Sequence, residues 1–310
     1  MLAAMPVERV PYDEFAYFHE NAEEFGLPYD GPPDVRREAV EVGDGRELSA
    51  LVWGRGEPEL VLLHGGAQNA HTWDTVALAL DRPLVAIDLP GHGHSDGGRG
   101  GALDPASNAL DVAVAVRALA PRARAVVGMS LGGVTTLALA AHAPDLVPAI
   151  VLVDITPGVD ETKAADIIAF VNGPESFDSF DDLLARTIAF NPTRTESSLR
   201  RGILHNAVQR DDGSWVWRYA RHRLGATGGD GVAGTGQPDF GSLWDVISGY
   251  EGPLMLVRGM RPQSVVDDAD EAELLRRRPD ARVEHVAEAG HSVQGDTPVE
   301  LAGLIADFVA

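Results

Sequence analysis

Short apolar runs alternate with segments of helical periodicity along most of the chain. The runs carry few polar positions, which is typical of strands that are buried on both faces of a sheet. Between them, apolar residues recur every three or four positions, as on the buried side of a helix. This alternation predicts an α/β fold in which helices flank a mostly parallel sheet on both faces. The predicted strands cover 59–63, 84–87, 125–127, 149–153, 254–257 and 282–285, and the predicted helices cover 71–80, 106–120, 131–142, 270–278 and 298–309.

The N-terminal part of the chain departs from this pattern. Residues 35–42 and 46–53 are separated by a Gly-Asp-Gly turn, which predicts a β-hairpin. Residues 1–34 are rich in proline, aromatic and acidic residues. We expect them to form an N-terminal arm that packs on the surface.

The alternation stops after Pro157 and resumes near residue 250. The intervening span contains amphipathic helical segments, an aromatic cluster and a glycine-rich stretch, but no buried strand is predicted. We therefore expect an α/β core formed by 35–158 and 250–310, with a helical lid over 159–249. Within the lid, the predicted helices cover 164–171, 180–190 and 196–208, the aromatic cluster covers 215–219, and the glycine-rich stretch covers 225–241.

Composition narrows the classes of function. The chain has 310 residues, of which 45% are hydrophobic and 23% charged, as in globular proteins. It contains no cysteine, which excludes disulfides, thiolate metal sites and a cysteine nucleophile. A net charge of −22 disfavours binding to nucleic acid or to anionic membranes. The first residues contain no apolar segment resembling a secretion signal, so we expect a cytoplasmic protein.

A candidate nucleophile lies between the predicted strand 125–127 and the helix 131–142. The sequence there is Gly128-Met129-Ser130-Leu131-Gly132, a G-x-S-x-G motif. Its place between a strand and a helix indicates the turn that carries a nucleophilic serine. The turn is strained at the serine, so small residues are needed two positions away on either side. It would present Ser130 at the carboxyl edge of the sheet, where open α/β sheets bind their ligands.

The loop after the strand 59–63 has the sequence Leu63-His64-Gly65-Gly66 and is a candidate oxyanion hole. A tetrahedral intermediate requires two preorganised N–H donors. We predict that one is the backbone N–H of Leu131, directly after the nucleophile, and that the other is that of Gly66. Glycine at position 66 would let the backbone approach a substrate closely.

The predicted general base is His291, which follows the last strand and therefore lies at the same sheet edge as Ser130. His285 lies within that strand, where a packed or exposed position is expected. His64 adjoins the oxyanion loop and is expected to hold loop backbone. Surface positions are expected for His71, His142, His205 and His222, which lie on predicted helices or in the lid.

A competing motif could hold metal ions. The run His92-Gly93-His94-Ser95-Asp96 resembles the ligand run of zinc metallohydrolases. Gly97 stands where a further histidine would be expected, and such a site needs several more ligands. We therefore predict no metal at this run and interpret it as a loop that leaves a buried strand.

Together, these motifs resemble the α/β-hydrolase superfamily, and most closely its lid-bearing branch of small esterases, lactonases, metal-free haloperoxidases and C–C bond hydrolases. The resemblance covers about residues 35–158 and 250–310 and implies the α/β-hydrolase fold. It also implies a serine hydrolase without a cofactor, whereas the dehalogenases and epoxide hydrolases of this fold use an aspartate in place of Ser130. The matching segments are 64–66, 88–95, 128–133 and 290–292.

The acid of the triad departs from the family pattern. In the common version of this fold it follows the strand before the last one, but residues 258–264 contain no carboxylate, and Gln263 stands about where the aspartate is usually found. Asp154 ends the strand after the nucleophile helix, where some members of this fold carry their acid. Asp267 and Asp268 follow the loop, where aspartate is favoured as a helix N-cap. We predict that Asp154 is the acid of the triad, with Asp267 or Asp268, or no acid at all, as the alternatives.

These residues predict hydrolysis of a carboxylic ester or a similarly activated carbonyl through an acyl-enzyme. A C–C hydrolase, a lactonase or a perhydrolase would use the same serine, and a non-catalytic ligand-binding protein could share the fold. Apolar lid residues favour a small, moderately apolar substrate as the partner. Homo-oligomers are possible. The lid residues in question are Ile167, Ile168, Phe170, Phe177, Phe190, Trp215 and Trp217.

Overall fold

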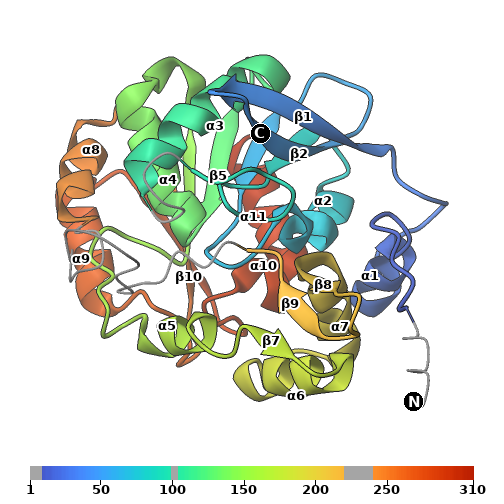
Figure 1. Ribbon diagram of the computed structural model, residues 1–310. Helices are drawn as coiled ribbons and strands as arrows, with labels where there is room; N and C mark the ends of the chain where they lie inside the picture. The colour runs from blue at the N-terminus through green and yellow to red at the C-terminus, as the bar shows by residue number, and fades with distance from the viewer. Residues whose placement is uncertain (1–8, 99–103, 220–239) are drawn as a thin grey trace, which may run out of the picture.

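A computed structural model of the protein describes residues 9–98, 104–219 and 240–310. Its centre is an eight-stranded sheet in the order β1-β2-β4-β3-β5-β6-β10-β11 (Figure 1). β1 and β2 form the predicted antiparallel hairpin, β2 is antiparallel to β4, and the other neighbours pair in parallel. The predicted mostly parallel α/β fold is therefore confirmed. The strands are β1 Val35–Gly43, β2 Arg46–Trp53, β3 Leu60–Leu63, β4 Leu84–Ile87, β5 Ala125–Met129, β6 Ile150–Val153, β10 Leu254–Gly259 and β11 Arg282–Val286.

The central strands are apolar throughout because helices cover both faces of the sheet. In β3, Val61 and Leu63 pack in the cluster that includes α3 and α4, whereas Leu60 and Leu62 pack in the one that includes α2 and α11. None of the helices in the described ranges combines the length and apolar character needed to cross a membrane. One face carries α3 Pro105–Leu119, α4 Leu131–His142, α8 Leu243–Gly249 and α9 Asp268–Arg277, and the other carries α1 Phe18–Phe25, α2 Asp74–Leu80, α10 Val293–Asp296 and α11 Pro298–Phe308.

The N-terminal arm is more deeply integrated than the sequence suggested. Phe18, at the start of α1, is buried and contacts Trp53 edge to face, with ring centroids 5.0 Å apart. The same helix reaches the lid, where Arg201 donates hydrogen bonds to Asn21, at 2.8 Å, and to Glu24. The arm therefore connects the core to the lid.

The lid contains the three predicted helices and a small sheet that the sequence pattern did not predict. The strands β7, β9 and β8 pair antiparallel in that order. They are two or three residues long, too short to show a period of two. The lid elements are α5 Ala165–Val171, β7 Ser176–Phe177, α6 Phe180–Phe190, α7 Glu196–Asn206, β8 Ala207–Gln209 and β9 Trp215–Trp217.

The C-terminal end of the expected lid belongs to the core. Helix α8 falls within the range 159–249, but its Trp244 and Ile247 pack in the same cluster as α4. Most of the glycine-rich stretch 225–241, together with His222, lies outside the described residues. Three 3-10 helices complete the described elements: η1 Ala70–Trp73, η2 Pro144–Leu146 and η3 Phe240–Ser242.

Candidate active site

Ser130 lies at the sharp turn between β5 and α4, as the motif predicts. Its backbone has φ 51° and ψ −118°, a strained conformation for a residue with a side chain. A Cβ atom at Gly132 would lie 2.1 Å from the carbonyl oxygen of Leu63. A Cβ atom at Gly128 would lie 2.4 Å from the carbonyl oxygen of Gly132. Both glycines are therefore required by the packing of the turn.

Replacing Gly132 with alanine should destabilise the protein by about 3 kcal/mol or more, because the added methyl group would collide with backbone rather than with a movable side chain. Gly303→Ala is the matched control: it lies within α11, and its Cβ would meet no atom within 4 Å. That substitution should stabilise the protein by about 0.5–1 kcal/mol. Chemical denaturation of both variants measures the difference. Equal stabilities would contradict this description of the turn.

His291 lies in the loop between β11 and α10 and is positioned by Asp154. The His291 Nδ1 atom lies 2.9 Å from the Asp154 Oδ2 atom, at hydrogen-bond distance. Asp154 directly follows β6, and β6 is the neighbour of the Ser130 strand β5. The structure thus brings the predicted base and one of the predicted acids together at the sheet edge where Ser130 lies.

The Asp154 carboxylate is fully buried, and its other contacts explain how the fold accommodates it. Its Oδ1 atom accepts hydrogen bonds from the Gly259 N–H at 2.9 Å and the Ser264 hydroxyl at 2.6 Å. Its Oδ2 atom accepts one from the Val265 N–H at 3.1 Å. These donors offset the loss of hydration that a buried carboxylate suffers. The loop in which the family's acid was expected thus supplies donors instead, and Gln263 is exposed.

The two alternative acids have structural roles elsewhere. Asp267 is the N-cap of α9, where it forms a capping box with Asp270, and it pairs with Lys163 at 2.9 Å. The side chain of Asp268 is 96% exposed and pairs with Arg258 at 2.8 Å. Of the three candidates, Asp154 is the one whose contact with His291 the structure records.

The predicted oxyanion donors border the same cavity as Ser130 and His291. Leu131 is the first residue of α4, so its N–H has no acceptor within the helix. Gly66 lies in the loop after β3, and a Cβ there would meet nothing within 4 Å. Gly65 is the more tightly packed of the pair, since its Cβ would lie 2.5 Å from the Met129 sulfur. The position where Gly66 would carry a side chain is therefore open, and Gly66 lines the cavity.

Two buried histidines hold this loop, and neither is placed as a base. The His64 Nε2 atom accepts a hydrogen bond from the Leu89 N–H at 2.9 Å, and burial lowers the pKa of His64. The His92 Nε2 atom accepts one from the Ala67 N–H at 3.1 Å. His92 therefore fixes the backbone beside Gly66, whereas His64 ties this loop to the loop after β4.

The side chains of His92, His94 and Asp96 also stabilise loops. Each contacts a different partner among the described residues, so the three do not face a common point where a metal could bind. His92 bonds to Ala67, whereas Asp96 accepts a hydrogen bond from the Glu47 N–H at 2.9 Å. The His94 ring lies 3.8 Å from the buried Asp88 carboxylate. Burial opposes the charge on Asp88, but His94 and the Arg37 guanidinium hold its pKa well below the usual value.

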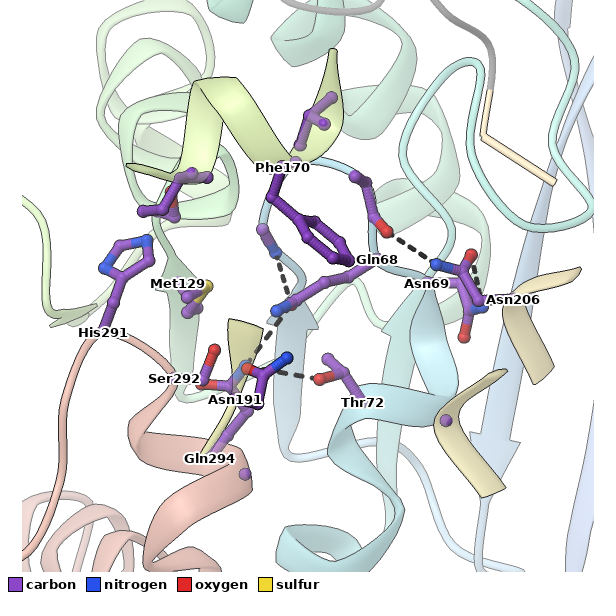
Figure 2. Close-up of a pocket in the computed structure, with 18 of the residues that line it drawn as sticks. Gln68, Asn69, Thr72, Met129, Phe170, Asn191, Asn206, His291, Ser292 and Gln294 are labelled. Carbon is purple, nitrogen blue, oxygen red and sulfur yellow. Dashed lines mark hydrogen bonds between the residues drawn. The ribbon is translucent and has the colours of Figure 1, made fainter. Parts of the chain in front are cut away.

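A cavity of about 620 Å³ separates the sheet edge from the lid. Its polar side includes Gln294, whose amide donates to Gln68 and Thr72 at 3.3 Å each (Figure 2). Two of the predicted lid residues, Phe177 and Trp215, pack within the lid instead of lining the cavity. The predicted lid residues that do line the cavity are Ile167, Ile168, Phe170, Phe190 and Trp217.

Two histidines predicted at the surface are buried. His71 and His205 were expected at the surface, but they are 7% and 4% exposed and lie in the cavity wall beside Asp74. Their rings stack on each other with centroids 3.8 Å apart. The apolar periodicity around His71 and around His205 could have indicated that each faces inward. It could not have indicated that His71, in the core, contacts His205, in the lid.

Comparison with known proteins agrees with this architecture. A family model of the alpha/beta hydrolase fold matches residues 58–298. The esterase Rv0045c of Mycobacterium tuberculosis is 45% identical over 301 residues, which cover 94% of each chain. A solved structure of that esterase, described together with its inhibition by transition metals, has a TM-score of 0.81 at 43% identity and covers 96% of this chain and 99% of that one.

More distant relatives share most of the same length. The sn-1-specific diacylglycerol lipase ABHD11 of Xenopus laevis is 27% identical over 264 residues, covering 81% of this chain and 80% of that one. A crystal structure of E-2-(acetamidomethylene)succinate hydrolase has a TM-score of 0.76 at 25% identity and covers 89% and 99% of the two chains. The chain therefore belongs to the alpha/beta hydrolase family, as a carboxylesterase-like enzyme.

Proposed function

We propose that the protein is a serine hydrolase that cleaves carboxylic esters of small, moderately apolar molecules through an acyl-enzyme. The observation that carries this proposal is the 2.9 Å contact between His291 Nδ1 and Asp154 Oδ2, made at the sheet edge of Ser130, where His291 and Ser130 line the same cavity. A nucleophile on a strained turn, a histidine and a buried carboxylate in the chain order Ser, Asp, His are the arrangement used for acyl transfer.

In this mechanism the Ser130 hydroxyl attacks the ester carbonyl carbon while His291 accepts the hydroxyl proton. The negative oxygen of the tetrahedral intermediate accepts hydrogen bonds from the N–H groups of Gly66 and Leu131. His291 then donates its proton to the departing alcohol, leaving an acyl group on Ser130. Water, deprotonated by His291, attacks the acyl-enzyme and releases the acid. Asp154 orients the imidazole and stabilises its positive charge throughout.

The cavity supports the assignment of the substrate class. Aromatic and aliphatic side chains such as Phe170, Phe190 and Ile167 line it on the lid side, and amides line part of the core side. Such a mixture suits an apolar chain attached to a polar, reacting group. The relatives are named as an esterase, a diacylglycerol lipase and a hydrolase of E-2-(acetamidomethylene)succinate. These names agree on hydrolysis but not on one substrate, so they support the reaction class and leave the substrate to the cavity.

The proposal is tested with p-nitrophenyl esters of increasing acyl length and with a serine-directed fluorophosphonate. We expect turnover of the short and medium esters, and we expect the phosphonate to add one group per chain, located on Ser130 by peptide mass spectrometry. A panel that includes lactones, peracid formation and C–C substrates separates these related activities from ester cleavage. If the protein binds such ligands without turning over any ester and stays unlabelled, the proposal is wrong and a binding protein is favoured.

A further inference from the structure

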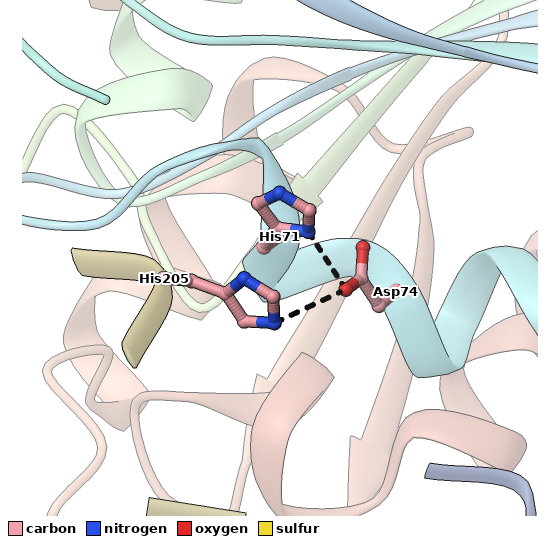
Figure 3. A group of neighbouring side chains, drawn as sticks. All are labelled: His71, Asp74 and His205. Atoms are coloured by element: carbon pink, nitrogen blue, oxygen red, sulfur yellow. Dashed lines mark hydrogen bonds and ion pairs between the residues drawn. The ribbon is translucent and has the colours of Figure 1, made fainter. Parts of the chain in front are cut away.

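His71, Asp74 and His205 form a cluster in the cavity wall that the proposed mechanism does not use (Figure 3). His71 lies in η1, Asp74 begins α2 of the core, and His205 lies in α7 of the lid. All three are more than nine-tenths buried. Elements far apart in the sequence thus bring together side chains of the types that bind transition metals.

The ligand atoms of these side chains face a common point. Asp74 Oδ2 lies 2.9 Å from His71 Nδ1 and 3.9 Å from His205 Nε2. One ligand atom from each of the three residues, a ring nitrogen or a carboxylate oxygen, lies within 4.8 Å of the other two. The two rings are nearly parallel, with an angle of 11° between their planes, and one nitrogen of each ring points towards Asp74 (Figure 3).

Two atoms of the cluster lack a hydrogen-bond partner among the described residues. They are Asp74 Oδ1 and His205 Nε2, and both are buried. Buried polar atoms are almost always satisfied, so each exception requires a physical reason. A cation between His205 and Asp74 would satisfy both residues.

The outer contacts of the histidines suit metal binding. His71 Nε2 lies 3.3 Å from a carboxylate oxygen of Glu14 and 3.3 Å from the Arg37 guanidinium, which Glu14 also neutralises. His205 Nδ1 lies 3.0 Å from the hydroxyl of Tyr12. Histidine ligands usually direct their second ring nitrogen to a carboxylate or another hydrogen-bonding group, which fixes the ring. These contacts leave His71 Nδ1 and His205 Nε2 facing Asp74 and available for an ion.

We propose that His71, Asp74 and His205 bind one divalent transition-metal cation of the zinc type. Two imidazole nitrogens and one carboxylate oxygen are a known ligand set for Zn²⁺, with a fourth position left open, here towards the cavity. Binding would release to solvent the proton that His71 Nδ1 shares with Asp74. Because the ligands come from η1, α2 and α7, the bound ion would tie the lid to the core.

The test uses the full chain, freed of metal with a chelator that is then removed. We expect Zn²⁺ titration calorimetry to show one tight equivalent, Co²⁺ to give the visible absorption of four-coordinate cobalt, and Zn²⁺ to raise Tm. His205→Phe keeps an aromatic ring but removes the ligand, and Asp74→Asn keeps the size but removes the charge. Each should bind Zn²⁺ at least about tenfold more weakly. The control His142→Gln changes an exposed histidine and should bind as the unchanged protein does.

Unchanged Zn²⁺ affinity in both variants would overturn the proposal, as would the absence of a tight equivalent in the unchanged protein; the cluster would then be a structural ion pair only. Anomalous diffraction from crystals soaked in Zn²⁺ gives an answer even where the variants fail to fold. A zinc peak among the three side chains supports the site, whereas zinc elsewhere, for example at His291, contradicts it. None of these measurements depends on esterase activity, so failure of the proposed function would leave this test intact.

Discussion

Replacing Ser130 with alanine should lower kcat/KM for p-nitrophenyl esters by about 10⁴-fold or more, because the substitution removes the hydroxyl proposed to form the acyl-enzyme. Removal of a catalytic serine typically leaves only the residual rate that substrate binding and the oxyanion hole supply. Alanine retains a Cβ at this position, so the backbone strain at φ 51° is unchanged and the fold should remain intact. Initial rates at several substrate concentrations, together with circular dichroism, measure both properties.

Ser176→Ala is a suitable control for this experiment, since that serine is exposed on β7 of the lid. It should retain full activity, and it should still react with the fluorophosphonate. If Ser130→Ala hydrolysed esters within tenfold of the unchanged protein, another nucleophile or a bound metal would have to be responsible.

Replacing Asp154 with asparagine should lower kcat by about 10⁴-fold and leave KM nearly unchanged. The carboxylate accepts a hydrogen bond from the Nδ1–H group of His291, which leaves Nε2 free to accept the serine proton. An amide in its place can donate instead and thereby favour the wrong tautomer. KM should change little because Asp154 is not among the described residues that line the cavity. Steady-state kinetics at fixed pH measure both constants.

Asp268→Asn is the matched control, because it makes the same chemical change at a side chain that is 96% exposed. Its kcat should be unchanged, and the Tm of both variants should be recorded to separate loss of folding from loss of catalysis. An inactive Asp268→Asn beside an active Asp154→Asn would refute the assignment of the acid.

The elements of the core could be predicted from the sequence because their signals are local. The helix over 131–142 and the strand over 84–87 have the predicted bounds, since the apolar pattern and the turn residues beside them coincide. Ser130 and His291 were predicted from local motifs, and both line the cavity. In the lid, α6 also has the predicted bounds, whereas the short strands around Trp215 carry no periodic signal.

The sequence favoured Asp154 but could not exclude Asp267, Asp268 or the absence of an acid, because the selection of the acid is a tertiary effect. Asp154 and His291 are 137 positions apart, and Asp154 and Ser264 are 110 apart. Only the folded arrangement shows which carboxylate receives donors from the loop after β10. The burial of His71 and His205 was missed for a similar reason, since each is covered by a segment distant in sequence, including the arm residues Tyr12 and Glu14.

The hydrogen bond from the Gly259 N–H to Asp154 has a consequence for the reach of the catalytic pair. Strand β10 lies between β6, which leads to Asp154, and β11, which leads to His291, so the two side chains must meet above its end. A Cβ at Gly259 would lie 2.3 Å from the carbonyl oxygen of Gly290, directly before His291. Because Gly259 has no side chain, Asp154 and His291 can approach each other across the end of the intervening strand β10. A triad acid can thus come from a different strand without any change in the position of the histidine.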